Sequence, residues 1–293
     1  MLPSQTRYRF SPITRRPDFC WPGGRRLALY VSLGIEEYVF GEGMTEDLFP
    51  GAPKPDDVNT SWRDYGNRVG GFRLIQRFRD LGIPSTILLN TAVYDHAPDL
   101  MDFAREAGCE IVGHGLTNSD TLVGRAPDDE AAYVKAVADR IESKEGYRPG
   151  GWSSPWLAHT DSTLDLLKEA GYRYLMDLRL DDQPVWLSTR AGPLLSIPYA
   201  LELNDSSTII GRQASATDFE RMIIDEFDEM LEASNTQPLV MSIVVHSFIS
   251  GQPFRLRALT RALRHIAARR DEVWITQPRE IAAFIEADPS LAA

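Results

Sequence analysis

The residues most able to do chemistry follow short apolar runs, at points where a buried strand would end. The run "ALYVSLGIEEY" stops at Glu36 and Glu37, "CEIVGH" stops at His114, and "PLVMSIVVH" stops at His246. A carboxylate and a histidine that face one pocket form a general base and a general acid. Hydrolysis of an amide by water needs both, because water must lose a proton and the departing nitrogen must gain one.

Each of these residues also has an ordinary structural explanation. An acid pair after a strand is most often a solvated turn, and a histidine between glycines, as His114 is, is most often a loop residue. Adjacent side chains of a strand face opposite ways, so only one of Glu36 and Glu37 naturally points inward. The sequence does not settle which one does. Several polar residues at the ends of different strands nevertheless favour a common site.

Elements that would position these residues alternate along the whole chain. Eight apolar runs suit strands, at 27–34, 84–90, 109–114, 150–156, 172–177, 193–199, 238–246 and 272–276. Seven amphipathic stretches suit helices, at Gly70–Leu81, Pro98–Gly108, Pro127–Gly146, Thr160–Gly171, Thr217–Ser234, Pro253–Arg269 and Pro278–Ala287. Strands that are apolar on both faces suit a parallel sheet covered by helices. We predict one closed α/β barrel domain over residues 1–293.

One long irregular stretch interrupts this alternation. Residues 41–60, "GEGMTEDLFPGAPKPDDVNT", follow the first predicted strand. The active sites of such barrels lie at the carboxyl ends of the strands. We therefore expect this insertion near the active-site mouth, as a lid or a contact between subunits.

Composition excludes several classes of function. The net charge of −11 and the pI of about 5.0 argue against a nucleic-acid partner, because an acidic surface repels phosphates. No apolar run is long enough for a membrane span or a signal peptide, so we expect a cytoplasmic protein with no membrane partner. The two cysteines, Cys20 and Cys109, suit reduced thiols. No GxSxG or GxGxxG motif is present, which disfavours a serine hydrolase and an organic dinucleotide cofactor.

The strand-end motifs resemble, in order, those of the polysaccharide deacetylase (NodB-homology) family, whose fold is a distorted (β/α) barrel of seven or eight units. The resemblance implies that Glu36 is the catalytic base, that His246 is the general acid, and that the backbone N–H of Trp156 in "SSPW" steadies the oxyanion. In the same motif, Ser153 stands where the family has an arginine. It also implies that Glu37, His114 and Asn118 in "GHGLTN" occupy the metal-ligand positions.

Further segments are similar to one branch of this family, which includes allantoinase-like and imidase-like hydrolases of cyclic amides. These segments are "DYGNRVGGFRL", "DDQPVW", "IPYALELND" and "HSFISGQPFRL". An asparagine is a weaker zinc ligand than a histidine, so a divalent metal such as zinc is possible but the altered triad leaves its presence open. The resemblance gives no role to an organic cofactor.

Three hypotheses follow for function. The first is a hydrolase that cleaves a non-peptide C–N amide bond of a small cyclic imide or ureide by general acid–base attack of water. The substrate would contact side chains among Arg68, Asn118, Asn204 and Trp186, with Glu202, Trp62 and Trp156 nearby. The alternative is a metal-dependent N-deacetylase acting on an N-acetylated carbohydrate. The third is a barrel without catalysis that serves binding or assembly. Since most soluble oligomers are symmetric, we expect a homodimer or homotetramer.

Overall fold

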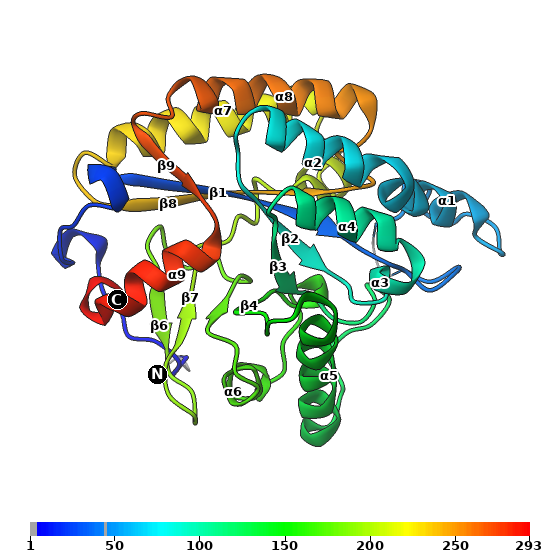
Figure 1. The fold of residues 1–293 in the computed structure, drawn as a ribbon, viewed down its shortest axis with the longest axis horizontal. Helices are drawn as coiled ribbons and strands as arrows, with labels where there is room; N and C mark the ends of the chain where they lie inside the picture. Colours follow the sequence, from blue (N-terminus) through cyan, green and yellow to red (C-terminus); the bar gives the residue numbers. More distant parts are fainter. Residues whose placement is uncertain (1–4, 44–45) are drawn as a thin grey trace.

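A single curved sheet forms the centre of the computed structural model, which describes residues 5–43 and 46–293 (Figure 1). Eight of its strands lie in the order β6-β7-β5-β4-β3-β2-β1-β8, and β9 pairs with β1 beside this path. The strands are β1 (Leu27–Ile35), β2 (Ser85–Leu89), β3 (Glu110–Gly113), β4 (Gly151–Trp152), β5 (Tyr174–Leu175), β6 (Val185–Leu187), β7 (Leu194–Ser196), β8 (Leu239–His246) and β9 (Val273–Thr276).

The strand pairing explains why the apolar runs have no polar face. All pairs are parallel except β6 with β7. All nine residues of β1 and all eight of β8 are buried, as expected for strands covered on both faces. The chain after β7 also meets β8, because Asn204 forms a parallel bridge with Val244. The sheet therefore curls into a distorted (β/α) barrel, and the predicted fold class is confirmed.

Helices cover the outside of the sheet. They are α1 (Asp57–Tyr65), α2 (Gly71–Asp80), α3 (Val93–His96), α4 (Pro98–Glu106), α5 (Pro127–Glu145), α6 (Thr163–Glu169), α7 (Ala216–Ala233), α8 (Pro253–Ala268) and α9 (Pro278–Ala287). In Figure 1, α7, α8 and α2 lie along one side of β1 and β8, whereas α5 and α6 lie on the other side of the molecule. Four of them begin with proline, whose missing N–H costs nothing in the first helical turn. One contiguous core extends from Trp21 to Ile285.

The elements agree with the sequence prediction except at short or irregular segments. Each of the eight apolar runs contains a strand, and each of the seven amphipathic stretches contains a helix. The antiparallel strand β6 was not predicted, because its three residues follow the polar segment "DDQP" and are not part of a longer apolar run. Helix α1 was also missed, and it begins at Asp57 inside the stretch 41–60 that we expected to be irregular. Residues 44 and 45 of that stretch lie outside the described residues. In the described part of the chain, no helix is long and apolar enough to cross a membrane.

Candidate active site

Three strand ends bring the predicted base, the predicted acid and one further histidine together. Glu36 follows β1, His114 follows β3 and His246 ends β8, and all three side chains are buried. The Nε2 atom of His246 lies 3.3 Å from Oε1 of Glu36, and Nε2 of His114 lies 3.5 Å from the same oxygen. Glu36 and His246 are thus in direct contact rather than on opposite sides of a pocket.

The other nitrogen of each imidazole fixes which way the ring faces. Nδ1 of His246 lies 2.6 Å from Oδ1 of Asp205, and Nδ1 of His114 lies 2.8 Å from the carbonyl oxygen of Ser153. A carboxylate and a carbonyl only accept hydrogen bonds, so both rings donate from Nδ1 and turn Nε2 toward Glu36. Asp205 also accepts from the His246 backbone N–H at 3.0 Å and from the Ser250 hydroxyl at 2.5 Å. Asp205 therefore holds the ring and the turn that follows it.

The charges in this group reinforce one another. Burial acts to raise the pKa of Glu36, but the positive charge of His246 and the hydrogen bonds from both histidines outweigh it, and the pKa falls below its ordinary value. Burial acts to lower the pKa of His246, but Glu36 and Asp205 raise the pKa well above its ordinary value. Glu36 is then ionised and His246 protonated at neutral pH. These are the states that a base and an acid need before the reaction begins.

A second carboxyl group reaches this site from the insertion. Glu46 is 4% exposed; its Oε1 accepts a hydrogen bond from the Ser206 hydroxyl, and its Oε2 is hydrogen-bonded to the Tyr38 hydroxyl. The Tyr38 hydroxyl also lies 2.7 Å from Oε2 of Glu36. It has only one proton for two carboxyl oxygens, so one of the two acids must carry a proton itself. Burial and the charge of Glu36 raise the pKa of Glu46, which makes Glu46 the protonated partner.

Asn118 connects this hydrogen-bond network to Trp156. Its Nδ2 donates to Oε2 of Glu36 at 3.0 Å and to the Tyr38 hydroxyl at 2.8 Å. The indole N–H of Trp156 donates to the Asn118 backbone carbonyl at 2.9 Å. The side-chain oxygen of Asn118 is buried and has no hydrogen-bond partner among the described residues. A buried acceptor without a donor is unusual and marks a place where a ligand group would be held.

The segment after β4 has the backbone strain expected near a functional site. Trp156 and Leu157 have positive φ angles of 61° and 52°. Asp177 holds this segment, because Oδ1 accepts from the Ser154 backbone N–H at 2.8 Å and Oδ2 lies 2.6 Å from Nε2 of His159. Among the described residues, no acceptor pairs with the backbone N–H of Trp156. The role of this N–H as an oxyanion donor stays a prediction.

A cavity of about 460 Å³ opens above these residues. Its floor includes Glu36, His114, Asn118 and His246. Its walls come from 46–50 of the insertion, from 154–157, from Tyr199, and from 204–211, which includes the helical segment η5 (Ser206–Gly211). Glu46, Asp47 and Pro50 of the stretch 41–60 therefore line this cavity.

The structure does not assemble the predicted metal triad. Oε1 of Glu37 lies 3.0 Å from Nδ1 of His96, and Nδ2 of Asn67 donates to Oε2 of Glu37 at 3.1 Å. These contacts belong to a separate hollow, which the exposed Arg68 also lines. Side chains alternate at the end of β1, so Glu37 turns away when Glu36 turns inward. The prediction that Glu37 shares a metal with His114 and Asn118 disagrees with this geometry, and Arg68 does not reach the cavity.

Of the remaining residues predicted to bind substrate, one lines the cavity and the others lie elsewhere. Asn204 lines the cavity, and its Oδ1 accepts from the Ser206 backbone N–H at 3.0 Å. Trp186 lies on β6, and its indole donates to the Pro289 carbonyl at 3.0 Å. Three further side chains have partners outside the cavity, namely Glu202 with Arg212, Trp62 with Phe248 and Asp181 with Arg16. The segment "DDQPVW" is therefore structural, and Trp186 is not a wall of the site.

A different set of residues can hold a divalent cation. Glu36, Glu46 and His246 each offer one ligand atom, and these atoms lie within 4.8 Å of one another. Carboxylate oxygens and an imidazole nitrogen are acceptable ligands for zinc and similar ions. This set has no residue in common with the predicted ligands Glu37, His114 and Asn118.

Sequence reasoning gave no role to four residues of the site, Tyr38, Glu46, Asp205 and Ser250. Asp205 follows Asn204 in "ELND" and Ser250 follows His246 in "HSFIS", so both lie beside residues that were singled out. The motif "DYGNRVGGFRL" proves to support the turn after His246. A methyl group on Gly70 would lie 1.9 Å from the Ser247 carbonyl oxygen. Only glycine allows the helical segment η3 (Gly66–Gly70) to approach that turn so closely.

Comparison with known proteins shows what the chain is similar to. The model of the family described as polysaccharide deacetylase matches residues 63–175. A protein of Schizosaccharomyces pombe described as "Putative polysaccharide deacetylase" is 27% identical over 277 residues, which cover 89% of this chain and 85% of that protein. The chain thus has a polysaccharide deacetylase domain match over residues 63–175 and is similar to a polysaccharide deacetylase over most of its length.

Two further relatives show the range of this family. The peptidoglycan deacetylase of Helicobacter pylori is 22% identical over 273 residues, which cover 82% of this chain and 92% of that protein. The crystal structure of the allantoinase Puue superposes with a TM-score of 0.82 at 27% identity and covers 95% of each chain. Like its polysaccharide deacetylase relatives, this chain is a hydrolase that acts on carbon–nitrogen bonds other than peptide bonds.

Proposed function

We propose that this enzyme hydrolyses the C–N bond of a small cyclic imide or ureide. The cavity above Glu36 and His246 carries the proposal. Its volume of about 460 Å³ lies within the range of small-molecule sites. Residues 46–50 and 206–211 wall it in, which leaves a compact pocket where a polymer would need a long groove.

In the proposed mechanism, Glu36 and His246 divide the proton transfers. The ionised Glu36 takes a proton from water, which attacks the ring carbonyl. The backbone N–H of Trp156 would donate to the oxyanion that forms there. His246, which Asp205 keeps protonated and oriented, then gives its proton to the leaving nitrogen. No step of this mechanism passes through a metal.

Two amide side chains suit a ring that carries both N–H and C=O groups. The side-chain oxygen of Asn118 is an acceptor without a donor, and a ring N–H would supply one. Asn204 lies on the opposite wall of the cavity and offers its own amide. Because the site has buried polar groups that need partners, it would reject rings that lack the matching hydrogen bonds.

A metal-dependent N-deacetylase is the second candidate, and one observation favours it. The group Glu36, Glu46 and His246 would hold a divalent cation, which would polarise a carbonyl oxygen and lower the pKa of a bound water. The relationship to the peptidoglycan deacetylase of Helicobacter pylori also supports this candidate. In that case the walls formed by residues 46–50 and 206–211 would have to open for an N-acetylated carbohydrate.

A substrate panel with metal analysis separates the two candidates. Purified protein is assayed with succinimide, hydantoin, dihydrouracil and allantoin, and with oligosaccharides of N-acetylglucosamine. Metal content is measured in parallel, before and after chelation. We expect ring opening for at least one cyclic amide, and a decrease of at least about 100-fold in kcat for Glu36→Gln and for His246→Ala. Deacetylation of the oligosaccharides with no ring opening would overturn the proposal.

A further inference from the structure

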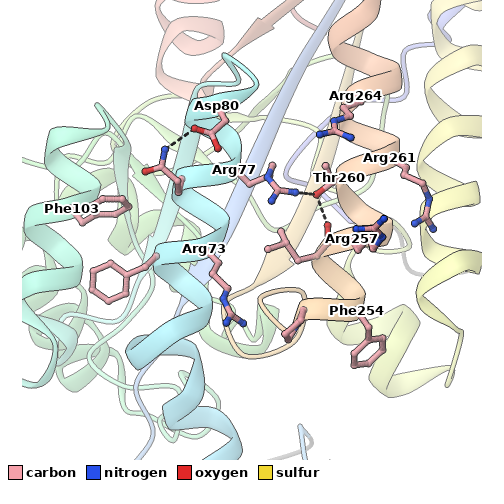
Figure 2. A pocket seen from close by; sticks show the side chains of 13 residues that line it. Arg73, Arg77, Asp80, Phe103, Phe254, Arg257, Thr260, Arg261 and Arg264 are labelled. Atoms are coloured by element: carbon pink, nitrogen blue, oxygen red, sulfur yellow. Dashed lines mark hydrogen bonds between the residues drawn. The ribbon is translucent and has the colours of Figure 1, made fainter.

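A basic groove lies between α2 and α8 and has a volume of about 1110 Å³. Figure 2 shows five arginines on its walls. Arg73 and Arg77 come from α2, and Arg257, Arg261 and Arg264 come from α8. Residues three, four or seven apart lie on one face of a helix, so each helix presents its arginines on the side that meets the groove. The groove shares no lining residue with the cavity above Glu36.

Within residues 5–43 and 46–293, four of these five guanidinium groups have no carboxylate partner. Among the described residues, sixteen arginines lie within 4.0 Å of a carboxylate oxygen, and Arg261 is one of them through Glu220. The other four arginines of the groove have no such partner. Arg73 donates to the Tyr65 hydroxyl at 2.5 Å, and Arg77 donates to the Thr260 hydroxyl. These hydroxyl groups supply no negative charge.

The only acid on the groove walls does not neutralise them. Asp80 accepts a hydrogen bond from the side chain of Gln76 at 2.7 Å and forms no ion pair with the arginines. Four uncompensated positive charges therefore face one hollow in a protein whose net charge is −11. Like charges gathered in this way repel one another, so an anion that bound between them would relieve the repulsion.

We propose that the groove between α2 and α8 binds a short, multiply charged phosphate ligand. Arginine forms paired hydrogen bonds with phosphate oxygens, and its planar fork suits them better than lysine would. A single phosphate would reach few of the four free guanidinium groups, whereas two or three linked phosphates would reach both helices. The acidic remainder of the surface repels a long polyanion, so the ligand is short.

An aromatic side chain at one end of the groove could stack against a planar organic group of such a ligand. Phe254 is 63% exposed, and Figure 2 shows it on α8 below Arg257. The Arg255 guanidinium lies over the Phe254 ring, 5.1 Å from the ring centre. The exposed ring offers a surface for stacking, so a nucleotide-like molecule with a planar base is compatible with the groove.

Calorimetric titration with inorganic triphosphate tests the proposal. Protein and ligand are matched in ionic strength, because charge contacts weaken with salt. We expect saturable binding at one site per chain. The double variant Arg257→Gln/Arg264→Gln should bind at least about tenfold more weakly, because it removes two charged donors that would pair with phosphate oxygens. Circular dichroism confirms that the variant is folded.

Arg79→Gln is the matched control. Arg79 is an exposed arginine of the same helix α2, has no ion pair and does not line the groove. The substitution Arg79→Gln removes one positive charge outside the proposed site, so this variant should bind triphosphate as the wild type does. Equal weakening by Arg79→Gln would mean that net charge alone controls binding.

Three other outcomes would overturn the proposal. One is the absence of saturable binding by the wild type. Another is a loss of oligomer mass in the double variant by light scattering, which would show that a second copy of the chain covers the groove. The third is binding to vesicles that contain phosphoinositides without binding to free triphosphate, which would assign the arginines to a membrane surface.

Discussion

Asp205 accepts the Nδ1 hydrogen of His246 across 2.6 Å, and this contact orients the acid of the site. The other ring nitrogen of His246 then faces Glu36 at 3.3 Å. Asp205 lies after β7 and His246 ends β8, so the contact joins two strand regions that are adjacent only because the barrel closes. The carboxylate oxygens of Asp205 accept three hydrogen bonds, from Nδ1 of His246, from the backbone N–H of His246 and from the Ser250 hydroxyl.

Replacement of Asp205 by asparagine should reduce kcat strongly. The amide removes the negative charge that keeps His246 protonated and allows the ring to turn. We expect a decrease of about 100-fold or more in kcat with little change in KM, measured with whichever substrate the panel identifies. Ser250→Ala removes a neighbouring hydrogen bond without removing the charge and should cost much less. Equal losses in both variants would mean that Asp205 acts only by holding the turn.

Gly34 leaves the space in which Glu36 and His246 meet. A methyl group at this position would lie 2.7 Å from Cδ2 of His246 and 3.1 Å from Oε1 of Glu36. Gly34→Ala should therefore push the two groups apart and lower kcat by at least about tenfold, because small displacements of reacting groups are costly. Ser32→Ala lies on the same strand, removes a buried hydroxyl without a partner, and should leave the rate close to that of the wild type.

Tyr38 and Glu46 should respond differently to conservative changes. Tyr38→Phe removes the hydroxyl that joins the two acids, and a hydrogen bond to a charged group is worth about 1.5–3 kcal/mol. We expect kcat to fall at least about tenfold. Glu46→Gln keeps a donor toward Tyr38, since the protonated Glu46 also donates there, and should stay within about threefold of the wild type. Glu46→Ala should lose activity because it leaves Tyr38 and Ser206 without their partner.

The same pair of variants also tests the cation site. If Glu46 were a metal ligand in the working enzyme, Glu46→Gln would weaken binding, because a neutral amide is a poorer ligand than a carboxylate. Metal content by mass spectrometry, with chelation and add-back, would then fall in Glu46→Gln while the wild type kept its ion. An unchanged rate and an unchanged metal content together support the hydrogen-bonded role.

Most strands and helices could be predicted because the residue pattern of each segment by itself indicates its secondary structure. Nine-residue and eight-residue apolar runs such as β1 and β8 can only be buried strands in a chain of this kind. The helices between them have normal start signals at proline. By contrast, β6 has three residues and pairs antiparallel, so its existence depends on β7 and not on its own pattern.

The site residues that follow strands were singled out from the sequence, whereas those that lie in loops were not. Glu36, His114 and His246 could be found because each closes an apolar run. Glu46 could not, because nothing in "GMTEDLF" indicates that this acid folds back onto Tyr38. The error over Glu37 has a simple cause. Alternation at the end of a strand allows either acid to face inward, and only the assembled barrel decides between them.

Glu110, at the start of β3, lies away from the cavity and should make stability depend on pH. Its oxygens accept hydrogen bonds from Tyr174, from Thr86 at 3.1 Å and from the Arg279 backbone N–H at 3.3 Å. Burial, opposed only in part by these bonds, raises the pKa of Glu110 to about 7 from its ordinary value of 4.5. The folded state therefore binds this proton more tightly than the unfolded state does.

Because of this difference, the free energy of unfolding decreases as the pH rises. The contribution of Glu110 to stability is fully present below pH 4.5 and is lost as the pH rises to about 7. A shift of this size corresponds to about 3 kcal/mol of unfolding free energy. Urea denaturation of the wild type and of Glu110→Gln at pH 5, 6, 7 and 8 measures the contribution. The variant cannot ionise, so the difference in unfolding free energy between the two proteins should favour Glu110→Gln increasingly as the pH rises. A difference that stays constant from pH 5 to pH 8 would mean that Glu110 keeps the same protonation state in the folded and unfolded chains.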